Sequence, residues 1–146
     1  MRIIHKATFL VTFSLAIGAF SFGQKPKSDS VAILARAIAN SDIYEVGYTV
    51  GYSGSISQQY QRFQRLVFLA TEQQLIDLAS RFENPVVRLY AFQALRQKKA
   101  NISEVLFKQF QNDKTIVTML KGCIGDKKAV NDLAKQNLNF PGGFIQ

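Results

Sequence analysis

The sequence has very few of the side chains that most often carry enzyme chemistry. Its 146 residues include one histidine, His5, one cysteine, Cys123, and no tryptophan. Histidine is the commonest general base at neutral pH and the commonest protein ligand of metals, so its scarcity removes most catalytic and metal-binding arrangements. One cysteine cannot form an internal disulfide, and the fold must therefore be stabilised by packing. We predict a protein that is not an enzyme and that uses no cofactor.

Residues 1–23 have the pattern of a secretory signal peptide. Arg2 and Lys6 form a short basic start, an uncharged stretch runs over residues 7–20, and small side chains follow at the two positions that signal peptidase reads. The uncharged stretch is about 14 residues, shorter than the roughly 20 that span a hydrocarbon core, which disfavours an uncleaved membrane anchor. We therefore predict cleavage before Gln24 and an exported protein, either periplasmic or secreted.

The charge of the remaining chain favours anionic partners. The predicted cleavage removes Arg2, Lys6 and His5, which lowers the formal net charge from +8 to +6 and leaves no histidine. A basic surface attracts acidic proteins, acidic glycans and anionic lipid headgroups. We expect an envelope or extracellular protein as the partner and an anionic glycan or lipid surface as the alternative. Nucleic acid is a poor candidate for an exported protein, and no stable membrane span is expected after cleavage.

Most of the remaining chain has the apolar spacing of three and four residues that is typical of amphipathic helices. Thr71 and Gln74 form a capping box, Asn84 is the expected cap of the next helix with Pro85 at its first position, and Asn101 should cap the helix after that. Residues 24–29 should be a flexible lead with Asp29 as the first cap, residues 30–138 a single domain, and residues 139–146 a loose tail. Helices are expected at about residues 30–40, 57–70, 71–82, 84–99, 101–110 and 126–138.

Residues 45–52 break the helical pattern. Apolar and aromatic side chains alternate there with glycine and threonine, a period of two that predicts an extended strand. Residues 115–124 are rich in threonine, isoleucine and valine, and they fit either a second strand beside the first or a helix that ends at Gly122 or Gly125. The residues that would share one face of the first strand are Val46, Tyr48, Val50 and Tyr52.

The segment from Asn84 to Leu95 resembles the second helix of a HEAT repeat, and residues 71–82 would be its partner helix. A degraded second unit is visible at residues 100–138, because similar residues recur 29 positions later. The residues that carry the resemblance are Pro85, Val87, Arg88, Ala91, Ala94 and Leu95 in the first unit, and Asp113, Ile116, Leu120, Cys123 and Ile124 in the second.

The resemblance implies a helical-repeat scaffold that presents one face to a partner and has no catalytic residues. We therefore predict a mainly α fold, a short HEAT-like repeat array, with a small two-stranded element that pairs about residues 45–52 with 115–120. The predicted function is an exported scaffold that binds another macromolecule in the cell envelope. A glycan- or lipid-binding module that uses Tyr48 and Tyr52 is the first alternative.

Five residues are candidates for the binding surface: Tyr48, Tyr52, Arg88, Lys98 and Lys99. Each also has a structural interpretation. The two tyrosines can stack on a sugar or anchor a peptide, or they can pack on the helices, which we favour. Arg88 is expected to pair with an acid, and its candidate partners are Asp77, Glu83 and Asp113. The two lysines form either a solvated helix end or a positive rim.

Cys123 provides a second alternative function, that of a thiol-dependent or redox protein. It lies close to Lys121, and a nearby cation can lower the pKa of a thiol. No histidine is available as its base, so we expect a buried, inert sulfur.

Overall fold

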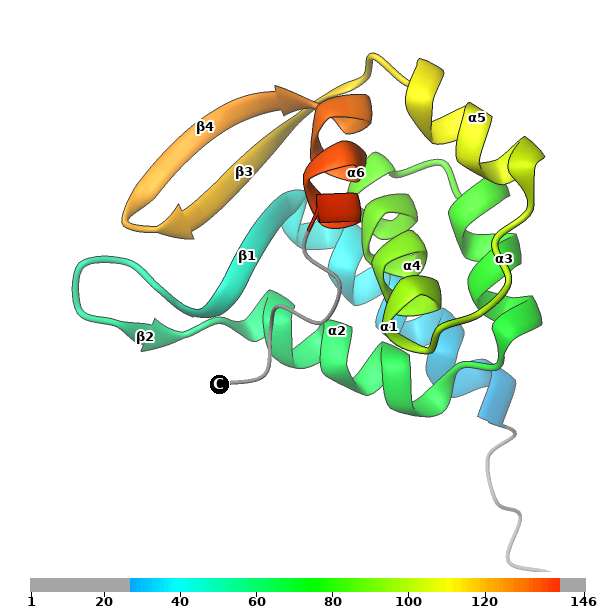
Figure 1. Cartoon of the computed structure of the whole chain (residues 1–146). Helices are drawn as coiled ribbons and strands as arrows, with labels where there is room; N and C mark the ends of the chain where they lie inside the picture. Colours follow the sequence, from blue (N-terminus) through cyan, green and yellow to red (C-terminus); the bar gives the residue numbers. More distant parts are fainter. Residues whose placement is uncertain (1–26, 140–146) are drawn as a thin grey trace, which may run out of the picture.

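The computed structural model describes residues 27–139, which form six helices and a four-stranded sheet (Figure 1). The predicted signal peptide, the start of the lead and residues 140–146 of the predicted tail lie outside these described residues. The elements, in chain order, are α1 (Lys27–Ser41), β1 (Ile43–Val50), β2 (Ser55–Ile56), α2 (Gln58–Leu69), α3 (Glu72–Arg81), α4 (Pro85–Gln97), α5 (Glu104–Asn112), β3 (Ile116–Gly122), β4 (Ile124–Ala129) and α6 (Val130–Asn139).

The prediction of a mainly α fold with a two-stranded element is wrong. The sheet has the strand order β2-β1-β3-β4, with β1 and β3 parallel at its centre and an antiparallel strand on each side. The two strands considered from the sequence do pair, with Ile43 opposite Thr118, but they are the middle of a larger mixed sheet. The chain is therefore an α/β protein rather than a helical array.

The second repeat-like unit does not form, because residues 116–129 make a β-hairpin. β3 is rich in β-branched residues and buries every second side chain, Val117 and Met119. The hairpin turn consists of two residues, Gly122 and Cys123, and Gly122 has a φ of 57°, which suits glycine at the first central position. β4 pairs with β3 over its full length, so the predicted helix begins only at Val130.

Two capping predictions are confirmed and two are wrong. Thr71 and Gln74 form both halves of a capping box at the start of α3, and the Asn84 side chain accepts bonds from the amides of Val86 and Val87 at the start of α4. Ser103, not Asn101, caps α5 by accepting from the amide of Leu106. Asp29 lies inside the first turn of α1 instead of capping it. The caps at Thr71 and Asn84 were thus predicted correctly from the sequence, and the caps of α1 and α5 were not.

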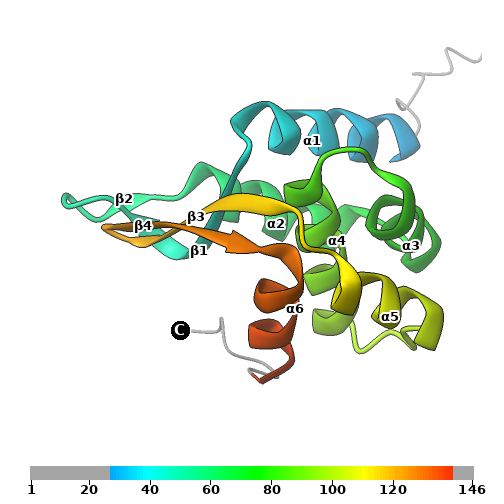
Figure 2. The ribbon, with the colours of Figure 1, turned by 90° about the horizontal axis from the view of Figure 1, so that it is seen from above.

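The centre of the molecule is α4, and most of its residues are buried. It packs against α1, α2, α3 and α6, and eight of its 13 residues are buried. A helix with so many buried apolar residues belongs in the core. The α3–α4 hairpin expected from sequence is present, but α4 presents no open binding face. The other helices are grouped around α4 on one side of the molecule, and the sheet extends towards the opposite side (Figures 1 and 2).

Candidate functional site

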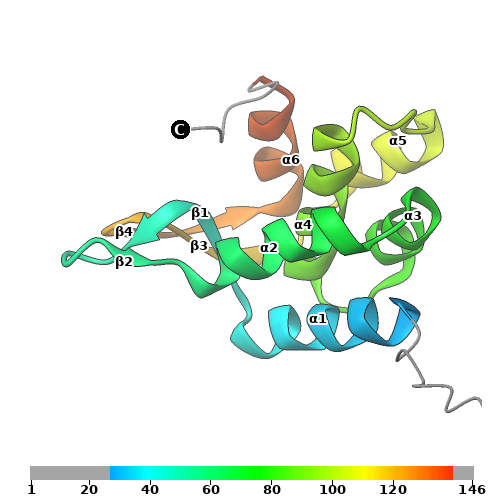
Figure 3. The same cartoon turned by 90° about the horizontal axis from the view of Figure 1, so that it is seen from below.

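One end of the sheet projects away from the helices. In three views the β1–β2 loop and the β3–β4 turn reach beyond the helical body, on the opposite side from α3 and α5 (Figures 1, 2 and 3). We call these two segments, residues 48–56 and 121–125, the sheet tip. The Gly51 amide donates to the Gly122 carbonyl over 3.0 Å, which holds the two segments together. The two segments of the tip are therefore joined through their backbones.

The sheet tip carries large apolar side chains that the core does not use. Tyr52 is fully exposed, Ile124 is 70% exposed, and Tyr48 and Ile56 are about half exposed. The interpretation that the two tyrosines pack on the helices is therefore wrong for Tyr52 and holds only in part for Tyr48. Single exposed apolar residues are ordinary, but a group at one projecting end of a fold is typical of an interaction surface.

A bulge in β1 explains why the tyrosines diverge. Glu45 pairs with Leu120 and Val50 pairs with Gly122, so four residues of β1 lie between these pairs where β3 has one. Gly47 lies within this bulge at a φ of 118°, a conformation that side-chain-bearing residues rarely adopt. The alternation predicted from sequence is interrupted there. Tyr48 consequently turns towards α2, whereas Tyr52 lies beyond the end of the strand.

The base of β1 is fixed to the core by buried polar contacts. The Tyr90 hydroxyl donates to the Glu45 carbonyl and accepts from the Glu45 amide, both over 2.9 Å. The hydroxyl of Tyr44 donates to Gln93 over 2.8 Å, and the Ser57 hydroxyl donates to the Glu45 carboxylate. Burial, followed by the neighbouring Tyr44, raises the pKa of Tyr90 well above its ordinary value. The projecting tip therefore rests on a rigid support.

A shallow groove of about 500 Å³ lies beside the tip, along α2; we call it the α2 groove. The ring of Tyr48 lines the groove and meets the ring of Tyr60 edge-on, with centroids 6.0 Å apart. The groove brings together arginine, glutamine and tyrosine side chains from two elements. Its lining residues are Tyr48, Gln58, Tyr60, Gln61, Arg62, Gln64 and Arg65.

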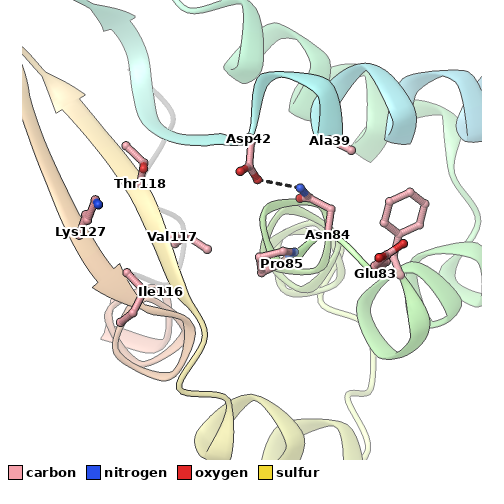
Figure 4. A pocket seen from close by; sticks show the side chains of 10 residues that line it. Ala39, Asp42, Glu83, Asn84, Pro85, Ile116, Val117, Thr118 and Lys127 are labelled. Carbon is pink, nitrogen blue, oxygen red and sulfur yellow. Dashed lines mark hydrogen bonds between the residues drawn. The ribbon is translucent and has the colours of Figure 1, made fainter.

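A second hollow, of about 730 Å³, lies between the end of α1, the start of α4 and the β3–β4 hairpin (Figure 4). Its most prominent polar contact joins the Asn84 amide group to the Asp42 carboxylate over 2.7 Å. The Asn84 oxygen already accepts from two amides of α4, and the amide of Asp42 donates to the carbonyl of Ala39 at the end of α1. These groups form hydrogen bonds at the ends of α1 and α4, so they stabilise the fold and are not free to bind a ligand in the hollow.

Arg88 is also committed to the fold. Its guanidinium donates to the carbonyls of Phe82 and Glu83 at the end of α3, and to the Asp113 carboxylate over 2.6 Å. Asp113 is one of the three partners expected from sequence. Burial raises the pKa of Asp113, but the hydroxyl and amide of Thr115 together with Arg88 outweigh this and lower it. Arg88 therefore stabilises the fold by joining α3, α4 and Asp113, and it does not belong to the sheet tip.

Lys98 and Lys99 lie at the other end of α4 and are exposed. Lys99 has a φ of 55°, and its amide donates to the carbonyl of Arg96, so the pair terminates the helix. Neither lysine lines the α2 groove, and neither do Tyr52 and Arg88. Of the five residues predicted from sequence, the structure thus places only Tyr48 in this groove.

Cys123 is exposed in the hairpin turn at the sheet tip, so the expectation of a buried sulfur is wrong.

Over residues 27–139, no group of three or more histidine, cysteine, aspartate or glutamate side chains is arranged to hold a metal ion. In the same part of the chain, no helix combines the length and apolar character needed to cross a membrane.

The polar side of α2 was not predicted from the sequence as part of a binding surface. Gln58, Gln61, Arg62 and Arg65 recur at intervals of three, four and seven residues, which places them on one side of a helix. That spacing could have been recognised in the sequence, but the position of Tyr48 beside it depends on the bulge in β1.

No protein-family model matches the sequence, and the search of curated proteins found no similar one.

Proposed function

We propose that this protein is an exported binding protein that engages another protein of the cell envelope through the sheet tip and catalyses no reaction. The observation that carries the proposal is the group of exposed apolar side chains at the projecting end of the sheet. Tyr52, Ile124 and Ile56 are large, and none of them belongs to the core. Export itself is inferred from the pattern of residues 1–23.

The energetics suit a binding surface. Burying an exposed isoleucine or aromatic side chain gains about 1.5–3 kcal/mol, and tyrosine is among the residues that most often dominate protein interfaces. Lys121 is exposed beside the hairpin turn and pairs with Ile124, so the fitting partner has an apolar patch with an acidic group at its rim. The short strand β2 and the charged strand β4 form the edges of the sheet, which limits indiscriminate strand pairing.

A capture experiment with matched variants tests the proposal. The wild-type protein and the double variant Tyr52→Ser/Ile124→Ser are immobilised and exposed to solubilised envelope proteins, and retained proteins are quantified by mass spectrometry. The control is Phe68→Ser/Val105→Ser, which removes two similarly exposed apolar side chains from the helices.

We expect a partner that the control retains and that the tip variant loses by at least tenfold. Equal retention by all three proteins, or equal loss in both variants, would contradict binding at the tip. Circular dichroism of each variant confirms that the fold is intact.

A further inference from the structure

The α2 groove has a chemical character different from that of the sheet tip. Two of its lining residues are arginines, three are glutamines, two are tyrosines, and none is acidic. The nearby Glu45 carboxylate accepts from the Ser57 hydroxyl and does not line the groove. The groove is therefore positive and rich in amide groups, with one exposed aromatic ring.

Arg62 is held in position before any ligand arrives. Its guanidinium donates to the Gln59 side-chain oxygen over 2.9 Å. Gln59 is 1% exposed, and its nitrogen donates to the carbonyls of Ile38 and Ile43, at the end of α1 and the start of β1. A guanidinium has five N–H donors, so this anchoring leaves donors for a ligand. Pre-ordering of this kind lowers the entropic cost of binding.

The remaining groups match the parts of a sugar acid. Arg65 is exposed one turn beyond Gln61 and Arg62, and each guanidinium group can bind a carboxylate through two parallel hydrogen bonds. Glutamine amides both donate and accept, as sugar hydroxyls do. The half-exposed ring of Tyr48 offers an apolar surface with a polar tip.

We propose that the α2 groove binds an oligosaccharide that contains uronic acid residues. A purely apolar ligand would leave the guanidinium and amide groups unpaired, and a simple anion would use neither the amides nor the tyrosine ring. The volume of about 500 Å³ falls within the range of ordinary small-ligand sites. This inference does not depend on protein binding at the sheet tip, which is argued from Tyr52, Ile124 and Ile56; Tyr48 is the one residue that the two surfaces share.

Isothermal titration calorimetry with hexagalacturonate tests the proposal, and the neutral maltohexaose is the ligand control. We expect hexagalacturonate to bind the mature protein and maltohexaose to bind at least tenfold more weakly. Arg65→Gln and Tyr48→Ala should each weaken hexagalacturonate at least fivefold. The matched control is Arg81→Gln, which removes an exposed arginine from α3, outside the groove.

Three results would overturn the proposal. They are the absence of hexagalacturonate binding, equal binding of the neutral sugar, and an equal loss in Arg65→Gln and Arg81→Gln, since the last would indicate attraction by net charge alone. An unchanged melting temperature excludes unfolding as the cause of a loss. The Tyr52→Ser/Ile124→Ser variant should bind hexagalacturonate as the wild type does, which separates this site from the sheet tip.

Discussion

Replacing Arg88 with methionine should destabilise the fold substantially, because this side chain joins three segments. It bonds two carbonyls at the end of α3 and the Asp113 carboxylate after α5, and both partners of the ion pair are only 15% exposed. Breaking a fully buried pair costs about 3–5 kcal/mol, and an exposed pair contributes at most about 1 kcal/mol. The partial burial here places the expected loss at about 2–3 kcal/mol.

Urea unfolding followed by circular dichroism measures this loss. For a domain of this size, about 2–3 kcal/mol corresponds to a fall of roughly 10 °C in melting temperature. The control is Lys108→Met, because Lys108 pairs with Glu104 where both side chains are mostly exposed, at 64% and 79%. It should change stability by less than about 0.5 kcal/mol. An equally small effect of Arg88→Met would refute the structural interpretation of Arg88.

The pH dependence provides an independent check on the same contact. Because the folded-state pKa of Asp113 is lowered, its stabilising contribution is complete above the unfolded-state pKa and is lost as the pH falls through the folded-state value. The stability difference between wild type and Asp113→Asn should therefore shrink in acid. A difference that stays constant from neutral pH down to acid would show that this carboxylate is not stabilised in the folded protein.

Three further predictions concern other contacts. Tyr90→Phe should lower the free energy of unfolding in urea by about 1–3 kcal/mol, because it leaves the Glu45 amide and carbonyl without their partner. Because the pKa of Tyr90 is raised in the folded protein, the stability of the wild type should also fall more steeply above pH 10 than that of the variant. Parallel pH profiles of the two proteins would contradict this. Gly122→Ala should lower the free energy of unfolding by about 1 kcal/mol, because Gly122 has a positive φ. Gly125→Ala should be nearly neutral, because Gly125 has an ordinary φ. Equal effects of the two substitutions would contradict the two-residue turn. Cys123 should react with a thiol reagent in the native protein at the rate of an accessible thiol, and reaction only after denaturation would contradict its exposure.

The helices could be predicted from sequence because their signals are local. The capping box at Thr71, the Asn84 cap and the apolar spacing all depend on residues within one or two turns. The class of the fold could not be predicted from the same signals. The strand preference of residues 116–122 competed with a weak repeat resemblance, and the choice depended on pairing with β1, more than 60 residues earlier along the sequence.

The candidate sites show the same division. An acidic partner for Arg88 could be expected from sequence, because an arginine one turn into the second helix of a repeat commonly pairs with an acid near the start of its neighbour. The exposure of Tyr52 and the turning of Tyr48 towards α2 could not, since both follow from the bulge at Gly47 and from the register between β1 and β3. The Gly122-Cys123 turn was the sequence signal that would have revealed the hairpin and the exposed cysteine.

The central claim is that the sheet tip contacts a protein partner, and site-specific photo-crosslinking tests it most directly. A photoreactive amino acid is placed at residue 52 and, as the control, at the exposed residue 105 in α5, and the two proteins are irradiated in envelope extract. We predict a crosslinked protein at residue 52 that is missing at residue 105 and that unlabelled wild-type protein suppresses by competition. Identical products at both residues, or products that resist competition, would contradict the claim.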